Sequence, residues 1–133
     1  MKRVLVVDDD PLVVKLVRTA LASEGLDVIG ASNGAECLQA VASQHPALII
    51  LDVAMPILDG FETLRILRAK PETASLPVIL LTARDSDADV VRGWASGADL
   101  YLTKPFEMGD LVLATKRILE ASEPSGGDEA GSG

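Results

Sequence analysis

Three consecutive aspartates, Asp8, Asp9 and Asp10, end the first apolar run of the chain in the stretch "LVVDDDP". Their carboxylates repel one another at neutral pH. A hard divalent cation removes that repulsion, and ligands that are all oxygen atoms select Mg²⁺ or Mn²⁺ over zinc. Asp10 stands before Pro11, a good first residue for a helix, so we expect Asp10 to act mainly as the helix cap. The stretch therefore predicts a metal site beside a helix N-terminus.

Short, β-branched runs alternate with helical patterns along the chain, and these elements must position the aspartates. Strands are expected at 3–7, 27–31, 47–51, 78–81 and 100–102, and helices at about 11–24, 34–43, 59–69, 87–96 and 107–121. The first helix is expected to bury one apolar face, formed by Val13, Leu16, Val17, Ala20 and Leu21. The strand runs are almost continuously apolar, as in strands that are covered on both faces. Five βα units with short connections predict an α/β fold, a doubly wound parallel sheet with helices on both sides.

Further polar residues come at the ends of the later strand runs. Asp52 follows the third run, Thr82 the fourth and Lys104 the fifth. Ligands of open α/β sheets gather beyond the carboxyl ends of the strands, so one rim receives carboxylates, a hydroxyl and an ammonium group. Taken alone, each residue has a plainer interpretation as a helix cap, a turn former or a solvated charge. Their recurrence at successive strand ends favours a functional site.

The composition narrows the class of protein. The chain has 133 residues and a formal net charge of −8, which disfavours bulk attraction to nucleic acid or to an anionic membrane. Cys37 is the only cysteine, which excludes an internal disulfide and a multi-thiolate metal site. One domain is expected over residues 1–121, and the small, polar residues 122–133 are expected to be a disordered tail or linker stub. With neither a signal peptide nor an apolar stretch long enough for a membrane span, a cytoplasmic location is expected.

Four stretches resemble one known family when they are taken together. They are "VLVVDDDP", "LIILDVAMPILDG", "PVILLTA" and "GADLYLTKPF". In combination they resemble the receiver domain of two-component response regulators, similar to the stand-alone chemotaxis type, over residues 2 to about 121. The resemblance implies a five-stranded (βα)5 flavodoxin-like sheet with strand order 2-1-3-4-5. It also implies a regulatory phosphoacceptor rather than an enzyme, a domain that catalyses only its own phosphorylation and dephosphorylation.

The resemblance assigns roles to the residues of the acidic rim. Asp52 corresponds to the phosphoacceptor. Mg²⁺, or Mn²⁺ in its place, is expected to bind Asp9 and Asp52 directly, together with the backbone carbonyl of Ala54, while Asp8 acts through metal-bound water. In the loop after Asp52, Gly60 is expected to adopt a backbone conformation that other residues resist.

The same resemblance extends to the later strands. Thr82 is expected to hydrogen-bond one phosphoryl oxygen, and Lys104 to neutralise another. The Lys104–Pro105 peptide bond is expected to be cis, which aims the lysine inward. Phosphorylation is then expected to draw Thr82 toward the site and to let Tyr101 swing into the space that it leaves.

A partner surface is expected on the fourth helix, the fifth strand and the fifth helix. Val90 and Trp94 lie four residues apart in the expected fourth helix, so they form one apolar row that is expected to face solvent beside Tyr101. Packing of Trp94 into a groove between helices is the alternative. The resemblance implies a sensor histidine kinase or phosphotransfer protein as donor. It implies an effector protein, an effector domain or a second copy of the chain as the partner of the phosphorylated form, with neither nucleic acid nor membrane bound directly.

Two other classes of protein share parts of this pattern. A haloacid-dehalogenase-type phosphatase also uses Mg²⁺ and an aspartate after the first strand, here Asp8 as nucleophile, followed by a threonine and a lysine. It leaves Asp52 unexplained and needs an adjacent acidic pair after Lys104 that the folded part lacks. A flavodoxin-like nucleotide-binding module needs a phosphate-binding loop after the first strand, where three aspartates repel phosphate.

Overall fold

The computed structural model describes residues 2–55, 57–83 and 97–121, which contain five strands and four helices. The strands are β1 (Arg3–Val7), β2 (Asp27–Ala31), β3 (Leu48–Asp52), β4 (Val78–Ala83) and β5 (Leu100–Lys104). The helices are α1 (Pro11–Ala22), α2 (Gly34–Gln44), α3 (Gly60–Ala69) and α5 (Met108–Ala121). The helix expected at 87–96 and the tail expected at 122–133 lie outside the described residues.

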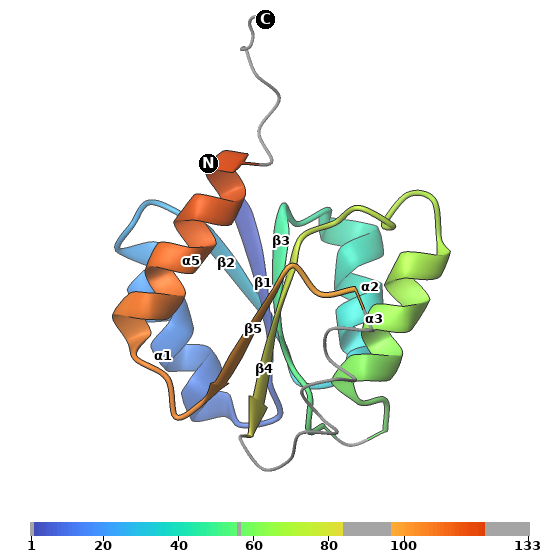
Figure 1. Cartoon of the computed structure of the whole chain (residues 1–133), viewed down its shortest axis with the longest axis horizontal. Coiled ribbons are helices and arrows are strands. Elements are labelled where there is room, and N and C mark those ends of the chain that lie inside the picture. The colour runs from blue at the N-terminus through green and yellow to red at the C-terminus, as the bar shows by residue number, and fades with distance from the viewer. Residues whose placement is uncertain (1, 56, 84–96, 122–133) are drawn as a thin grey trace, which may run out of the picture.

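All neighbouring strands pair in parallel, in the order β2-β1-β3-β4-β5. Helices α1 and α5 cover one face of the sheet, and α2 and α3 cover the other (Figure 1). This arrangement confirms the predicted fold class and strand order. In the part of the chain that the structure describes, none of the helices has the length and apolar character needed to cross a bilayer.

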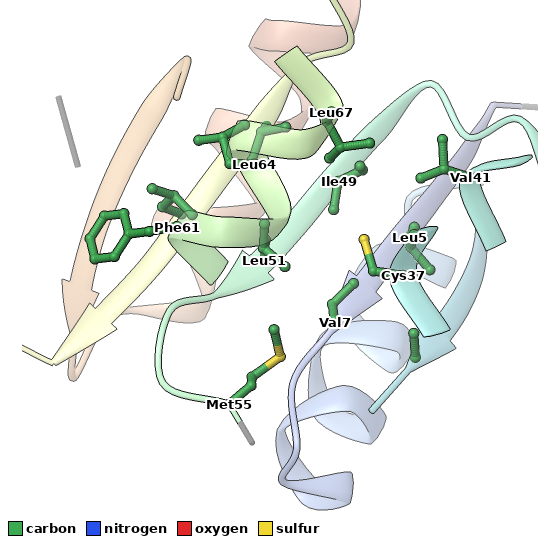
Figure 2. Close-up of a cluster of buried hydrophobic side chains, with 13 residues drawn as sticks. Leu5, Val7, Cys37, Val41, Ile49, Leu51, Met55, Phe61, Leu64 and Leu67 are labelled. Carbon is green, nitrogen blue, oxygen red and sulfur yellow. The ribbon is translucent and has the colours of Figure 1, made fainter. Parts of the chain in front are cut away.

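The central strands are apolar on both faces because each face meets a separate layer of helices. Along β1, Leu5 and Val7 belong to the cluster beneath α2 and α3, whereas Val4 and Val6 belong to the cluster beneath α1 and α5. Figure 2 shows the first of these clusters, which Met55 joins from the loop after β3. Successive side chains of a strand point to opposite faces, so continuous burial produces a continuous apolar run.

Three strands end at later residues in the structure than in the prediction. Strand β3 is displaced by one residue, so Asp52 is its last residue, and β4 and β5 are each two residues longer than expected. Thr82 pairs with Thr103 in the ladder between β4 and β5, and Ala83 pairs with Lys104. Thr82 and Lys104 therefore lie within strands rather than after them. The backbone ladder continues through polar residues, whereas the apolar pattern ends at the last buried hydrophobic side chain.

The helix ends follow the expected capping chemistry, but the apolar face of α1 is narrower than expected. The Asp10 side chain accepts a hydrogen bond of 2.9 Å from the backbone N–H of Leu12, which confirms its role as cap. Val17 and Leu21 are buried, whereas Leu16 is 51% exposed. Leu16 lies about 100° around the helix from Val17. The prediction that Leu16 belongs to the buried face is therefore wrong.

Candidate functional site

Three aspartates from two adjacent strand ends form one carboxylate cluster. Asp8 and Asp9 follow β1, and Asp52 ends β3, which pairs directly with β1. One carboxylate oxygen from each of the three residues lies within 4.8 Å of the others. Asp8 and Asp52 are 2% and 4% exposed, whereas Asp9 is exposed. The order of the strands therefore brings together residues that lie more than forty positions apart in the sequence.

Lys104 reaches the same cluster from β5. Its Nζ lies 3.1 Å from Oδ2 of Asp8 and 3.2 Å from Oδ1 of Asp52. The Lys104–Pro105 peptide bond is cis. Thr82, on the intervening strand β4, is 3% exposed. The three strands β3, β4 and β5 thus present a carboxylate, a hydroxyl and an ammonium group in spatial order.

The charges of this cluster are unbalanced. Burial, and after it the neighbouring Asp8 carboxylate, raise the pKa of Asp52 to about 6 against the opposing attraction of Lys104. Burial lowers the pKa of Lys104, but its ion pairs with Asp52 and Asp8 outweigh burial and leave this pKa above its ordinary value. Among the described residues, one ammonium group therefore faces two buried carboxylates, and a bound cation would relieve the remaining repulsion.

The oxygen atoms of the cluster suit a divalent cation. Asp8 is already engaged on both oxygens, because Oδ1 accepts a hydrogen bond of 2.9 Å from the backbone N–H of Asp10 and Oδ2 pairs with Lys104. Among the described residues, the Asp9 carboxylate has neither an ion pair nor a hydrogen bond. Ala54 is exposed in the loop that follows Asp52. A carboxylate set of this kind selects a hard ion such as Mg²⁺.

The loop between β3 and α3 differs from the prediction in which residue carries the unusual backbone. Ile57, not Gly60, has a positive φ, of 74°. Gly60 is required for close packing instead, because a Cβ at this position would overlap the carbonyl oxygen of Asp52 and lie 2.8 Å from Cα of Val53. The backbone N–H of Gly60 also donates a hydrogen bond of 2.9 Å to the carbonyl of Val53. Gly60 thus holds the start of α3 directly against the residue that ends β3.

Gly60→Ala is expected to lower the free energy of unfolding by about 1–3 kcal/mol, the range for overpacking of a tightly packed site. Gly109→Ala is the matched control, because a Cβ at Gly109 in the first turn of α5 meets no atom within 4 Å. Alanine stabilises an open helical position relative to glycine, so this control should be neutral or slightly stabilising. Urea denaturation of both variants measures the difference, and equal stabilities would contradict the role of Gly60.

The structure places the residues of the expected partner surface only in part. Tyr101 is partly buried on β5 and packs against the cluster beneath α2 and α3. Val90 and Trp94 lie outside the described residues. A groove that was not predicted lies between α1 and β2; it opens at Asp8 and Asp9 and is lined by Lys15 and Arg18 of α1. The available signal was Gly30 within a strand, a position that marks the close approach of another group.

Comparison with known proteins agrees with this geometry. A family described as the response regulator receiver domain matches residues 4–116. Response regulator MprA of Mycobacterium sp. (strain KMS) is 41% identical over 128 residues, which cover 96% of this chain and 55% of the relative. The alkaline phosphatase synthesis transcriptional regulatory protein PhoP of Bacillus subtilis (strain 168) is 43% identical over 122 residues, which cover 92% of this chain and 50% of the relative. The chain thus spans about half the length of these curated relatives.

The solved structures point in the same direction. The receiver domain of the Francisella response regulator 1452 is 34% identical and superimposes with a TM-score of 0.85, over 92% of this chain and 100% of that domain.

These matches give no support to the phosphatase alternative with Asp8 as nucleophile. Receiver domains are regulatory phosphoacceptors of two-component signalling, and an acidic pocket that binds Mg²⁺ is typical of them. The aspartate cluster, the lysine that faces it and the matches over most of the chain show that the chain belongs to the response regulator receiver domain family.

Proposed function

We propose that this domain is a phosphorylation-dependent switch in which Asp52 accepts a phosphoryl group from a sensor histidine kinase, a phosphotransfer protein or a small phosphodonor. The main support for this proposal is the position of Asp52. Its carboxylate lies with those of Asp8 and Asp9 on one side, and its Oδ1 lies 3.2 Å from the Nζ of Lys104. An attacking oxygen flanked by a metal-binding cluster and a fixed cation is the arrangement that phosphoryl transfer requires.

The metal proposal follows from the bonding of each carboxylate. Asp9, which is exposed and unpaired among the described residues, and Asp52 would bind Mg²⁺ or Mn²⁺ directly, together with the backbone carbonyl of Ala54. Asp8 would act through water, because its two oxygens already bond to Asp10 and Lys104. When bound, the metal supplies positive charge for the phosphoryl oxygens.

Each residue of the rim would have a separate role in the phosphoryl transfer. An oxygen of Asp52 attacks phosphorus in line with the leaving group, a P–O bond to Asp52 forms, and the bond to the donor imidazole or carboxylate breaks with its electron pair. Lys104 would turn from the free carboxylate to an equatorial phosphoryl oxygen, and Thr82 would donate a hydrogen bond to another. Hydrolysis of the acyl phosphate at the same site would reset the switch.

The output proposal uses the two strands beyond Asp52. Thr82 would move toward the phosphoryl group, and Tyr101 on the adjacent strand would turn inward, which changes the surface formed by the fourth helix, β5 and α5. Val90 and Trp94 would form the apolar part of that surface. Its partner would be an effector protein or domain, or a second copy of the chain in a phosphorylation-linked dimer.

We further propose that residues 1–121 are the receiver unit and that residues 122–133 are a tail or linker. Action on a separate partner, as in stand-alone chemotaxis-type receivers, and action on an attached domain would use the same surface. Because the whole chain has a net charge of −8, the protein would contact neither nucleic acid nor membrane directly, and it would act in the cytoplasm.

Location of the acyl phosphate tests the proposed function. The protein is incubated with acetyl phosphate and Mg²⁺, reduced with borohydride and digested, and the modified residue is identified by mass spectrometry. Reduction of an aspartyl phosphate yields homoserine, and we expect this product at position 52. Modification at Asp8 would overturn the proposal in favour of the phosphatase chemistry, and the absence of any product would remove both.

A further inference from the structure

A groove of about 800 Å³ leads along helix α1 to the aspartate cluster. Asp8 and Asp9 lie at one end, and Val14, Lys15 and Arg18 of α1 form one wall. The end of β2 and the first turn of α2 form the other wall. From Pro11 to Arg18 the helix rises by about 10 Å, so the groove extends about that far from the acidic rim. Its volume lies within the range of small-molecule sites.

Gly30 makes room for a cationic side chain in this groove. A Cβ at position 30 would lie 2.9 Å from Cγ1 of Val14 and 3.0 Å from Nη2 of Arg18. The guanidinium group of Arg18 therefore lies against the backbone of β2, inside the groove. Gly30 is exposed on an edge strand, where a side chain would otherwise cover this space.

The two cations of the groove are available to an anion. Within the described ranges, Lys15 and Arg18 have no ion-pair partner, unlike Arg3, Arg68, Lys104 and Lys116, which are paired. Glu36, on the opposite wall, is held at the start of α2, because its Oε1 accepts hydrogen bonds of 2.8 Å from the backbone N–H and the hydroxyl of Ser32. The groove thus has one cationic wall in a chain whose net charge of −8 repels anions.

We propose that this groove admits small anionic phosphodonors, such as acyl phosphates, and that Lys15 and Arg18 attract them toward Asp52. The inference rests on the proposed function, because it identifies how the phosphodonor reaches the same site. Two positive charges within about 10 Å of the rim raise the local concentration of a dianion several-fold at low ionic strength. At high salt the Debye length falls to about 3 Å and this attraction is screened.

The double variant Lys15→Gln/Arg18→Gln tests the proposal. Time courses of acyl phosphate formation with acetyl phosphate and Mg²⁺ are followed by intact-mass spectrometry, and the second-order rate constant is compared with that of the wild type. We expect a loss of about 3- to 10-fold at about 10 mM ionic strength and less than 2-fold at about 0.5 M. The control Arg65→Gln/Arg117→Gln removes the same charge from exposed positions on α3 and α5, outside the groove. The rate constant of this control variant should fall much less than that of the groove variant.

The outcomes separate the proposal from simpler explanations. The charge-conserving variant Lys15→Arg/Arg18→Lys should keep a near-wild-type rate. Equal losses in the groove variant and the control variant would show a general effect of net charge and overturn the inference, as would an unchanged rate in the groove variant. If wild-type Asp52 carries no label at all, the proposed function fails, and the inference fails with it.

Discussion

Asp52→Asn is expected to abolish phosphorylation by acetyl phosphate in the presence of Mg²⁺, with a loss of essentially the whole mass adduct. The substitution keeps the shape of the side chain but replaces the attacking carboxylate oxygen with a poor nucleophile. It also leaves the Lys104–Asp8 ion pair of 3.1 Å in place, so the surroundings of the site should persist. Intact-mass spectrometry measures the adduct, and circular dichroism checks the fold.

Asp10→Asn is the matched control for this experiment. Asp10 belongs to the same run of aspartates, but its side chain caps α1 through the backbone N–H of Leu12, and asparagine caps helices equally well. This control should keep both the adduct and the stability of the wild type. A full adduct on Asp52→Asn that maps to Asp8 would contradict the assignment of the phosphoacceptor.

Much of the fold could be predicted because burial on two faces leaves a strong pattern in the sequence. The continuous apolar runs around Leu5 and Ile50 are typical of strands that are covered by helices on both sides, and the Asp10–Pro11 pair marks the start of α1. The convergence of Asp8 and Asp52 then follows from the pairing of β1 with β3. The strand order itself came from the family resemblance, since several orders satisfy the same alternation.

Other features could not be predicted because they depend on three-dimensional packing. The close approach of Gly60 to the carbonyl of Asp52 involves residues eight positions apart, and nothing in their types distinguishes it from a turn that needs a positive φ. The positive φ belongs to Ile57, a β-branched residue for which this conformation is uncommon. The exposure of Leu16 likewise depends on how much of α1 the neighbouring elements cover.

In the metal-free protein, the contribution of Asp52 to stability is expected to decrease as the pH rises from about 4 to about 7. The pKa of Asp52 is about 6 in the folded protein, above its ordinary value of 3.8, so the folded state binds more protons than the unfolded state between these values. Its contribution to stability is therefore complete below pH 3.8 and is lost as the pH rises through 6. The interval corresponds to about 3 kcal/mol. Lys104 does not add to this change, because its pKa lies above 10.5.

Comparison with Asp52→Asn isolates this contribution from those of the other carboxyl groups. Urea denaturation in EDTA at a series of pH values gives the free energy of unfolding of both proteins. The stability of Asp52→Asn should lack the pH dependence that comes from protonation of Asp52. Above pH 7 the variant should therefore be more stable than the wild type by up to about 3 kcal/mol. Parallel pH profiles for the two proteins would show that burial and the Asp8 carboxylate do not raise the pKa of Asp52.

Mg²⁺ should reverse the loss of stability at neutral pH, because an ion that binds only the folded state stabilises it by RT ln(1 + [L]/Kd). Asp9→Ala is the informative variant, since Asp9 is exposed and has no ion pair among the described residues. Without metal, this variant should be at least as stable as the wild type, because one of three crowded carboxylates is gone. With metal, it should lose most of the gain in Tm. An undiminished gain in Asp9→Ala would place the ion elsewhere and would leave the repulsion among the aspartates without its proposed counter-charge.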